Sequence, residues 1–242
     1  MSDYQKTSNP LVEYLNSVVR VYFYLYISLL LCSNHKHCTL NEDVFTLGFE
    51  KISKFAFKGV LPPEGVVLHI GTRQGGEDDV IESKSHKIYD KIVAVAKTLG
   101  LNCIADYEDF THYNTGDGGV DLIGCIAMPE SNMGQEIVIL AQSATAKSKV
   151  DIEKKQSDAS YARWKGWIKF LGTSLNILFM AASVRQPDGR FVKDFYRQAD
   201  AILIDRNRII TFISYWRNRS EENLAEQIIP YEIDQCITEL VS

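Results

Sequence analysis

Two apolar runs joined by a short polar connection constrain most strongly what this chain can fold into. The first run follows a glycine-rich turn, residues 116–119, and has Asp121 at its head. The second run begins at Ile137 and ends on Gln142, and the residues between the runs, 128–134, include Pro, Ser, Asn and Gly. Short apolar runs bounded by turn residues are typical of strands. The pattern therefore predicts two antiparallel strands that lie side by side.

These two strands would bring together side chains that can bind a metal ion. Asp121 offers a carboxylate, and Gln142 on the neighbouring strand offers an amide oxygen. Magnesium and manganese take such oxygen ligands, and a bound divalent cation activates water and neutralises phosphate charge. Lys147, shortly after the second run, would orient the water or stabilise charge on the phosphate. An ordinary glycine turn before a strand, with a second strand that ends in glutamine, is the other interpretation of the same residues.

The Gly-Gly-x-Asp element that ends at Asp121, followed by a strand that ends on Gln142 and then by a lysine, resembles the PD-(D/E)XK nuclease superfamily and, within it, the Mrr-like restriction endonucleases. The resemblance extends from the helix before Gly116 to Lys147. It implies a metal-dependent nuclease that hydrolyses DNA phosphodiester bonds in restriction or antiviral defence. Its catalytic residues would be Asp121, Gln142 and Lys147, and its cofactor Mg²⁺ or Mn²⁺.

One position departs from the family pattern. The family carries a lysine two residues after the position of Gln142, where this chain has Ala144. Lys147 is therefore interpreted as a migrated lysine. The alternative is a catalytically decayed nuclease fold, which binds nucleic acid or a partner protein without cutting.

Further candidate residues flank the site on both sides. A helix is predicted over residues 80–99, and the resemblance implies an acidic metal ligand from this helix, which we assign to Glu82. Lys149 and Lys165 lie in a basic stretch that also contains tryptophan, and such stretches meet phosphate backbones, so they are the predicted nucleic-acid contacts. The tryptophans themselves are assigned to the core.

The periodicity of the whole chain predicts an α/β protein with a mixed central sheet flanked by helices. Residues 61–242 would form a restriction-endonuclease-like domain, and residues 1–60 a helical N-terminal region. Helices are expected over residues 11–32, 41–57, 80–99, 148–170, 190–198 and 221–241. Further strands are expected over residues 66–71, 101–106, 175–184 and 201–204.

Charge and composition limit the kinds of binding partner and the location that we expect for this chain. The net charge of −5 over 242 residues argues against a chain coated with basic surface for nonspecific nucleic-acid binding. The apolar run after Arg20, residues 21–32, has only 12 residues, fewer than the about 20 that span a bilayer, so residues 18–32 predict a buried helix or a homodimer contact rather than a membrane anchor. The polar N-terminus and five cysteines predict a cytoplasmic protein with reduced thiols. DNA is the expected partner, with a further subunit supplying specificity or activation.

Overall fold

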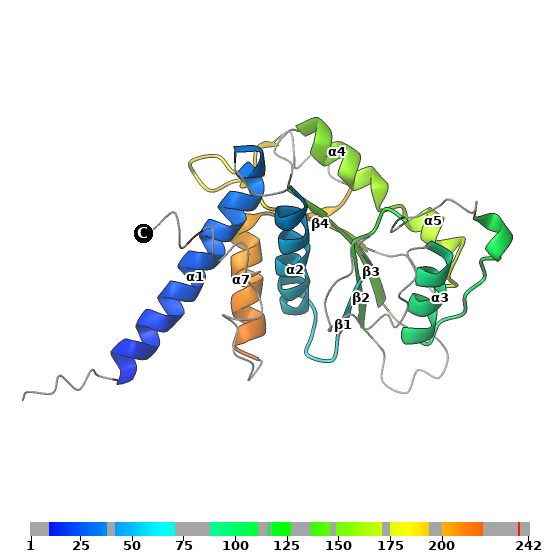
Figure 1. The fold of residues 1–242 in the computed structure, drawn as a ribbon, viewed down its shortest axis with the longest axis horizontal. Helices are drawn as coiled ribbons and strands as arrows, with labels where there is room; N and C mark the ends of the chain where they lie inside the picture. The colour runs from blue at the N-terminus through cyan, green and yellow to red at the C-terminus, as the bar shows by residue number, and fades with distance from the viewer. Residues whose placement is uncertain are drawn as a thin grey trace, which may run out of the picture.

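A five-stranded mixed sheet lies at the centre of the described part of the chain (Figure 1). The computed structural model describes residues 10–37, 42–70, 88–110, 116, 118–126, 137–145, 149–170, 175–193, 200–219 and 237. The strand order is β1-β2-β3-β4-β5. The strands are β1 Val66–His69, β2 Leu122–Ile126, β3 Ile137–Ala144, β4 Leu175–Met180 and β5 Ile202–Ile204.

The sheet is antiparallel on one side and parallel on the other. Strands β1, β2 and β3 pair antiparallel, and Leu122 lies opposite Ala141. Strand β4 pairs parallel with β3, and β5 parallel with β4. The predicted antiparallel pair of β2 and β3 and the predicted mixed sheet flanked by helices are therefore confirmed. Because parallel strands end at the same edge, the carboxyl ends of β3, β4 and β5 lie together.

Helices cover both faces of the sheet. Leu122, Ile139 and Phe179 point to the face covered by three helices, α1 (Pro10–Asn34), α2 (Glu42–Val60) and α7 (Arg206–Arg217). The alternate strand residues, such as Ile123 and Leu140, point to the other face, as the two-residue period of strands requires. That face is covered by α3 (Ile88–Thr98), α4 (Lys149–Asp158) and α5 (Tyr161–Lys165).

The predicted boundary after residue 60 coincides with the end of α2, but α2 belongs to the same core as the sheet. The ring of Phe57 lies 5.6 Å from the ring of Phe179 on β4, centroid to centroid. Arg219, just after α7, donates hydrogen bonds to the carbonyl oxygens of Lys58, Gly59 and Leu61, which lie at and just beyond the end of α2. The N-terminal helical region is thus joined to the α/β part by shared packing.

Some expected elements differ from the structure, and others, among them the helix predicted over 221–241, lie mostly or partly outside the described residues. The helix predicted over 148–170 is divided into α4 and α5, because Ser160 caps the start of α5 by accepting a hydrogen bond from the Arg163 backbone. The strand predicted over 101–106 is wrong, since only an isolated bridge joins Cys103 to Ile168. Helix α3 begins at Ile88, and residues 80–87 lie outside the described residues. The helix predicted over 190–198 falls mostly outside them, and the sequence reasoning missed α7.

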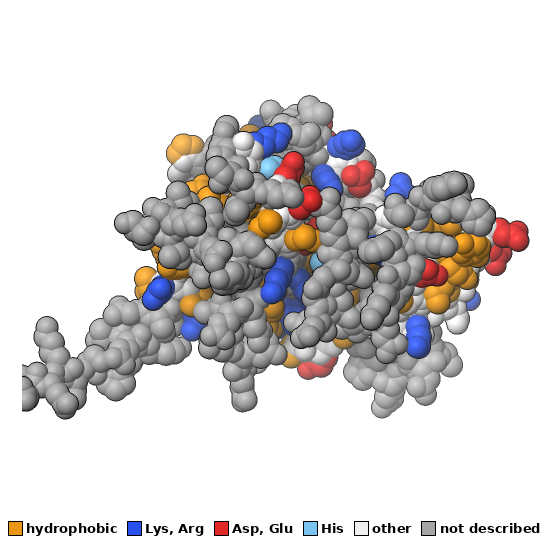
Figure 2. Space-filling model, in the orientation of Figure 1, with side chains coloured by type: hydrophobic (Ala, Val, Ile, Leu, Met, Phe, Trp, Pro, Cys, Tyr) orange, Lys and Arg blue, Asp and Glu red, His pale blue; other side chains and the backbone are white. Residues whose placement is uncertain are grey.

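The surface carries mixed charge. On the face seen in Figure 2, basic and acidic side chains are interspersed, as the net charge predicted, and hydrophobic side chains gather on the side where α3 lies. Exposed Ile104 and Tyr107 belong to the segment that follows α3. In the described ranges no helix combines the length and the apolar character needed to cross a bilayer.

Candidate functional site

The glycine turn that precedes β2 is held against α5. Gly118 and Gly119 have φ values of +64° and +78°, a left-handed backbone conformation that glycine adopts without steric cost. The carbonyl oxygen of Gly118 accepts hydrogen bonds from Trp164 Nε1 and from Arg163 Nη1, both at 3.2 Å. Trp164 is fully buried, which confirms its assignment to the core. The turn is therefore fixed before it reaches Asp121.

Asp121 is buried between β1 and β3, with only 4% of its surface exposed. Its carboxylate Oδ2 accepts the backbone N–H of Ser143 at 2.7 Å. Its own backbone N–H donates to the carbonyl oxygen of Ala141, and its carbonyl oxygen accepts the N–H of Ile70. A carboxylate that accepts a backbone N–H is held in one orientation, so Asp121 is a preorganised oxygen ligand beside β3.

Gln142 lies on β3 next to this carboxylate and is 2% exposed. Its side-chain Nε2 donates a short hydrogen bond to the carbonyl oxygen of Gly119. Its Oε1 accepts a hydrogen bond from Lys155 Nζ at 3.3 Å. The glycine turn therefore sets the orientation of the amide and directs its oxygen towards an ammonium group.

Lys155 reaches this position because α4 runs back along β3 and β4. Ile152 of α4 packs with Ala144 and Met180 near the ends of these strands. At the other end of the helix, the carbonyl oxygen of Ala159 accepts a hydrogen bond from Asn176 at the start of β4. Lys155 lies between these two anchors. We refer to Asp121, Gln142 and Lys155 as the site cluster.

The structure describes only some of the site residues that were predicted from the sequence. It brings Asp121 and Gln142 together, as predicted. Lys147 and Glu82 lie outside the described residues. Lys149 is the first residue of α4, and its side chain is outside the described part. Lys165 is exposed at the end of α5.

Two lysines near the site were not assigned to it from the sequence. Lys155 stands 13 positions after Gln142 in a helix with other lysines, so spacing gave no signal. Lys91 of α3 is only 1% exposed, and its Nζ donates to the carbonyl oxygen of Ile70 at 3.0 Å. The backbone N–H of Ile70 donates to the backbone carbonyl oxygen of Asp121, so Ile70 contacts both the buried ammonium group of Lys91 and the backbone of Asp121. The only signal for Lys91 in the sequence was its place within the apolar face of a predicted helix.

Asp121 and Gln142 are the residues of the site cluster whose oxygens could hold a metal ion. Among the described residues there is no group of three or more His, Cys, Asp or Glu side chains that could hold a metal ion. Asp121 and Gln142 supply two oxygen donors, one charged and one neutral. Magnesium is often bound by one or two carboxylates together with several waters, so Asp121 would be the main protein ligand.

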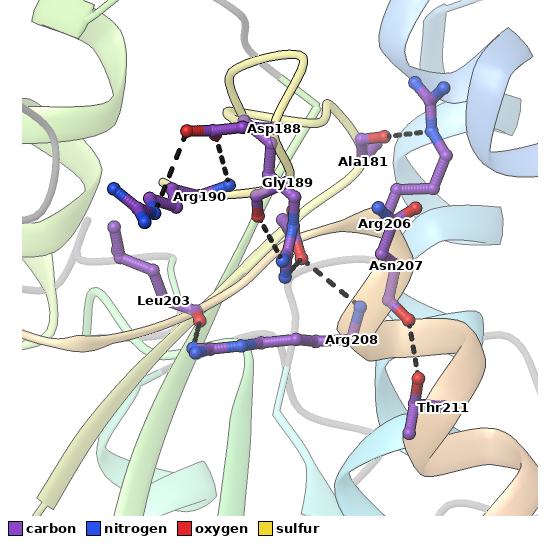
Figure 3. A network of polar contacts seen from close by, with 11 residues as sticks. Ala181, Asp188, Gly189, Arg190, Leu203, Arg206, Asn207, Arg208 and Thr211 are labelled. Atoms are coloured by element: carbon purple, nitrogen blue, oxygen red, sulfur yellow. Dashed lines mark hydrogen bonds and ion pairs between the residues drawn. The ribbon is translucent and has the colours of Figure 1, made fainter. Parts of the chain in front are cut away.

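A second polar network lies at the carboxyl ends of β4 and β5 (Figure 3). Arg185 donates to both carboxylate oxygens of Asp205, at 2.6 and 2.9 Å, and Asp205 is fully buried. The hydrogen bond to Asp205 raises the pKa of Arg185 above its ordinary value. Asp205 also accepts the backbone N–H of Arg208 and so caps α7. Of the charges that follow β5, Asp205 is therefore ion-paired, with Arg185.

Comparison of the chain with protein-family models, curated proteins and solved structures gave no match. The geometry and the chemistry of the site cluster therefore carry the functional argument.

Proposed function

We propose that this chain is a metal-dependent nuclease that hydrolyses phosphodiester bonds in DNA. The site cluster is the observation that carries the proposal. It joins a buried carboxylate and a buried amide oxygen from adjacent strands to an ammonium group that contacts the amide. Phosphoryl chemistry needs this combination, because a cation must be held and negative charge on the phosphate must be stabilised. The mixed sheet flanked by helices supports a restriction-endonuclease-like fold.

The protein residues would divide the work as follows. Asp121 and Gln142 would hold Mg²⁺ or Mn²⁺, which supplies an activated water and neutralises phosphate charge when bound. Lys155 would stabilise the negative charge that develops on the phosphate oxygens as the water oxygen attacks phosphorus and the bond to the leaving oxygen breaks. Buried walls would strengthen these interactions, because they keep the local dielectric low. Lys147 stays a second proposed source of the ammonium group.

A specific observation favours a second candidate function, in which the same fold binds DNA or a partner protein without cutting. The Gln142 oxygen is already hydrogen bonded to Lys155, and Gln142 carries no charge, so the metal affinity of the cluster rests mainly on Asp121. A restriction or antiviral role, with specificity supplied by a partner subunit, depends on the first candidate and is part of that proposal.

Cleavage of plasmid and single-stranded DNA in Mg²⁺, Mn²⁺ or EDTA tests the proposal. The variants are Asp121→Asn, Lys155→Met and Lys147→Met, with Lys154→Met as the matched control. Lys154 is the exposed neighbour of Lys155 on α4. We expect metal-dependent cutting by the wild type, loss of cutting with Asp121→Asn, and a fall of about 10²–10³-fold with Lys155→Met, as for removal of one transition-state donor.

The outcomes separate the candidates. Full activity of Lys155→Met together with loss in Lys147→Met would keep the nuclease and move the ammonium role to Lys147. Metal-dependent cutting that survives Asp121→Asn would contradict the site cluster. Binding of DNA by the wild type without cutting, in either metal, would favour the binding module.

A further inference from the structure

Two arginines at the carboxyl edge of the parallel strands enclose one aromatic ring. The guanidinium carbons of Arg185 and Arg208 lie 4.6 and 4.5 Å from the ring centroid of Phe191. Phe191 packs against the cluster formed by α4 and the ends of β3, β4 and β5. Stacking on an aromatic face holds a guanidinium in place and leaves its donors at the edge of the plane. We call these three residues, together with exposed Lys193, which follows Phe191 by two positions, the arginine edge.

The arginine edge carries positive charge that its surroundings do not neutralise. Asp205 gives both of its oxygens to Arg185 and is fully buried. Arg208 and Lys193 are exposed, and within the described residues no carboxylate lies within ion-pair distance of either. Arg208 Nη1 donates to the carbonyl oxygen of Leu203 at 2.7 Å, which leaves its other donors available. The carboxylate of Asp205 thus neutralises only Arg185 and leaves the other two cations without a counter-charge among the described residues.

Arg208 follows the N-cap residue Asp205, whose buried carboxylate is ion-paired with Arg185. It lies in the first turn of α7, which also contains Arg206 and has no acidic residue. The N-terminal end of a helix carries partial positive charge, so it disfavours cations and favours anions. A phosphate placed here would be stabilised by the helix end and by the guanidinium together. An exposed guanidinium that is held beside the helix end by stacking on Phe191 is suited to binding an anion.

Arg206, the other arginine of this turn, serves packing instead. Its Nε donates to the carbonyl oxygen of Ala181 and its Nη2 to Ser33 of α1, and it is 7% exposed. In Figure 3 its guanidinium lies on the opposite side of the network from those of Arg190 and Arg208. Arg206 is therefore not part of the arginine edge.

The register of the sheet relates the arginine edge to the site cluster. Gln142 pairs with Leu178 on β4, and Leu178 pairs with Leu203 on β5. The Leu203 carbonyl that binds Arg208 is therefore in the same row as Gln142, two strands away. Neighbouring strands lie about 4.8 Å apart, which places this carbonyl about 10 Å from Gln142. A nucleic-acid backbone that crosses the carboxyl edge of the sheet spans this distance within a few nucleotides.

We propose that the arginine edge binds the phosphate backbone of the nucleic acid on which the site cluster acts. The inference rests on the proposed function and deepens it, because it names the surface that positions the substrate. Arg208 would contact one phosphate through its remaining donors, and Lys193 would contact a second. Such contacts position the backbone and carry no base specificity.

The salt dependence of DNA binding tests the inference. The probe is a fluorescently labelled 30-base-pair duplex, and its affinity for the full chain is measured over a series of NaCl concentrations in EDTA, so that no cutting occurs. The charge variant is Arg208→Gln with Lys193→Gln. Its matched control, Lys36→Gln with Lys51→Gln, removes the same charge from exposed residues on the α1–α2 side. Arg208→Lys keeps the charge and removes the planar fork.

We expect the charge variant to lower the slope of log K against log[salt] by about 1.8, or about 0.9 for each lost phosphate contact. The control variant should keep the wild-type slope, and Arg208→Lys should keep most of it. Circular dichroism of each variant checks that the fold persists. A wild-type slope in the folded charge variant would overturn the inference.

Cleavage by the wild type in Mg²⁺, measured in parallel, separates the two proposals. If the wild type cuts DNA and the charge variant keeps the wild-type slope, the arginine edge is wrong and the nuclease stands. If the wild type binds without cutting and the charge variant loses slope, the arginine edge stands and the nuclease fails. A wild type that neither binds nor cuts DNA would overturn both.

Discussion

Replacement of Gly119 with alanine should destabilise the protein more than the same replacement at Gly100. Both glycines have left-handed backbone, with φ of +78° and +67°. A Cβ on Gly119 would fall onto the carbonyl oxygen of Asp158 and lie 2.9 Å from its carbonyl carbon, whereas Gly100 has nothing within 4 Å. Asp158 presents backbone at the end of α4, so no side-chain rotation relieves the overlap.

The expected free energies follow from these two observations. An alanine forced into the left-handed region costs about 1–2 kcal/mol, and this is the whole cost expected at Gly100. Overpacking against backbone adds about 1–3 kcal/mol at Gly119, so the total there is about 2–5 kcal/mol. The carbonyl oxygen of Gly119 also accepts the Gln142 amide, so any displacement of the turn changes the orientation of a site residue.

Urea denaturation followed by tryptophan fluorescence gives the free energy of unfolding of the wild type and of both variants. We expect Gly119→Ala to lose clearly more stability than Gly100→Ala, and to lose DNA cleavage while Gly100→Ala retains it. Equal losses of stability in the two variants would refute the reasoning, because the close packing of α4 on the glycine turn would then have no energetic effect. Gly189→Ala, with φ +83° and nothing within 4 Å, provides a second control for the backbone cost.

Two further predictions concern charges away from the site cluster. Arg185→Met should destabilise the protein by about 3–5 kcal/mol, because it leaves the buried Asp205 carboxylate without its cation, and adding Asp205→Asn should restore part of the loss in urea denaturation. Burial raises the pKa of Tyr161 above its ordinary value of 10.0, so its stabilising contribution is complete below pH 10 and falls as pH rises further. Tyr161→Phe should therefore weaken the fall in unfolding free energy above pH 10, and an unchanged pH profile would contradict this.

The sequence predicted the strand pair of the site because its signal is local. Asp121 and Gln142 bound two apolar runs separated by turn residues, and pairing of neighbouring runs follows from that pattern alone. The prediction of this strand pair rests on a local sequence pattern and needs no knowledge of contacts between distant segments, which is why it was correct.

The missed elements depend on contacts between distant segments or on a signal that was masked by charge. Helix α7 begins with three polar residues, Arg206, Asn207 and Arg208, which are also typical of a polar connection. Its buried residues, Ile209, Ile213 and Trp216, nevertheless follow helical spacing, so the signal was present in the sequence. The strand expected at 101–106 had the right composition but found no strand partner beyond one bridge to Ile168. The composition of a segment does not show whether another strand is available to pair with it.

The lysine of the site shows most clearly why packing must be known. Ala144, where the resembled family carries lysine, is 2% exposed and packs with Ile152 of α4 and the apolar ends of β4 and β5. A lysine there would bury its ammonium group among apolar side chains, at a large desolvation cost. Lys155 follows Ile152 by three positions and so lies on nearly the same helix face. The contact of Ile152 with Ala144 therefore packs α4 against the sheet and brings Lys155 to Gln142. Because the residue at position 144 is small, the helix can pack this closely and supply the ammonium group.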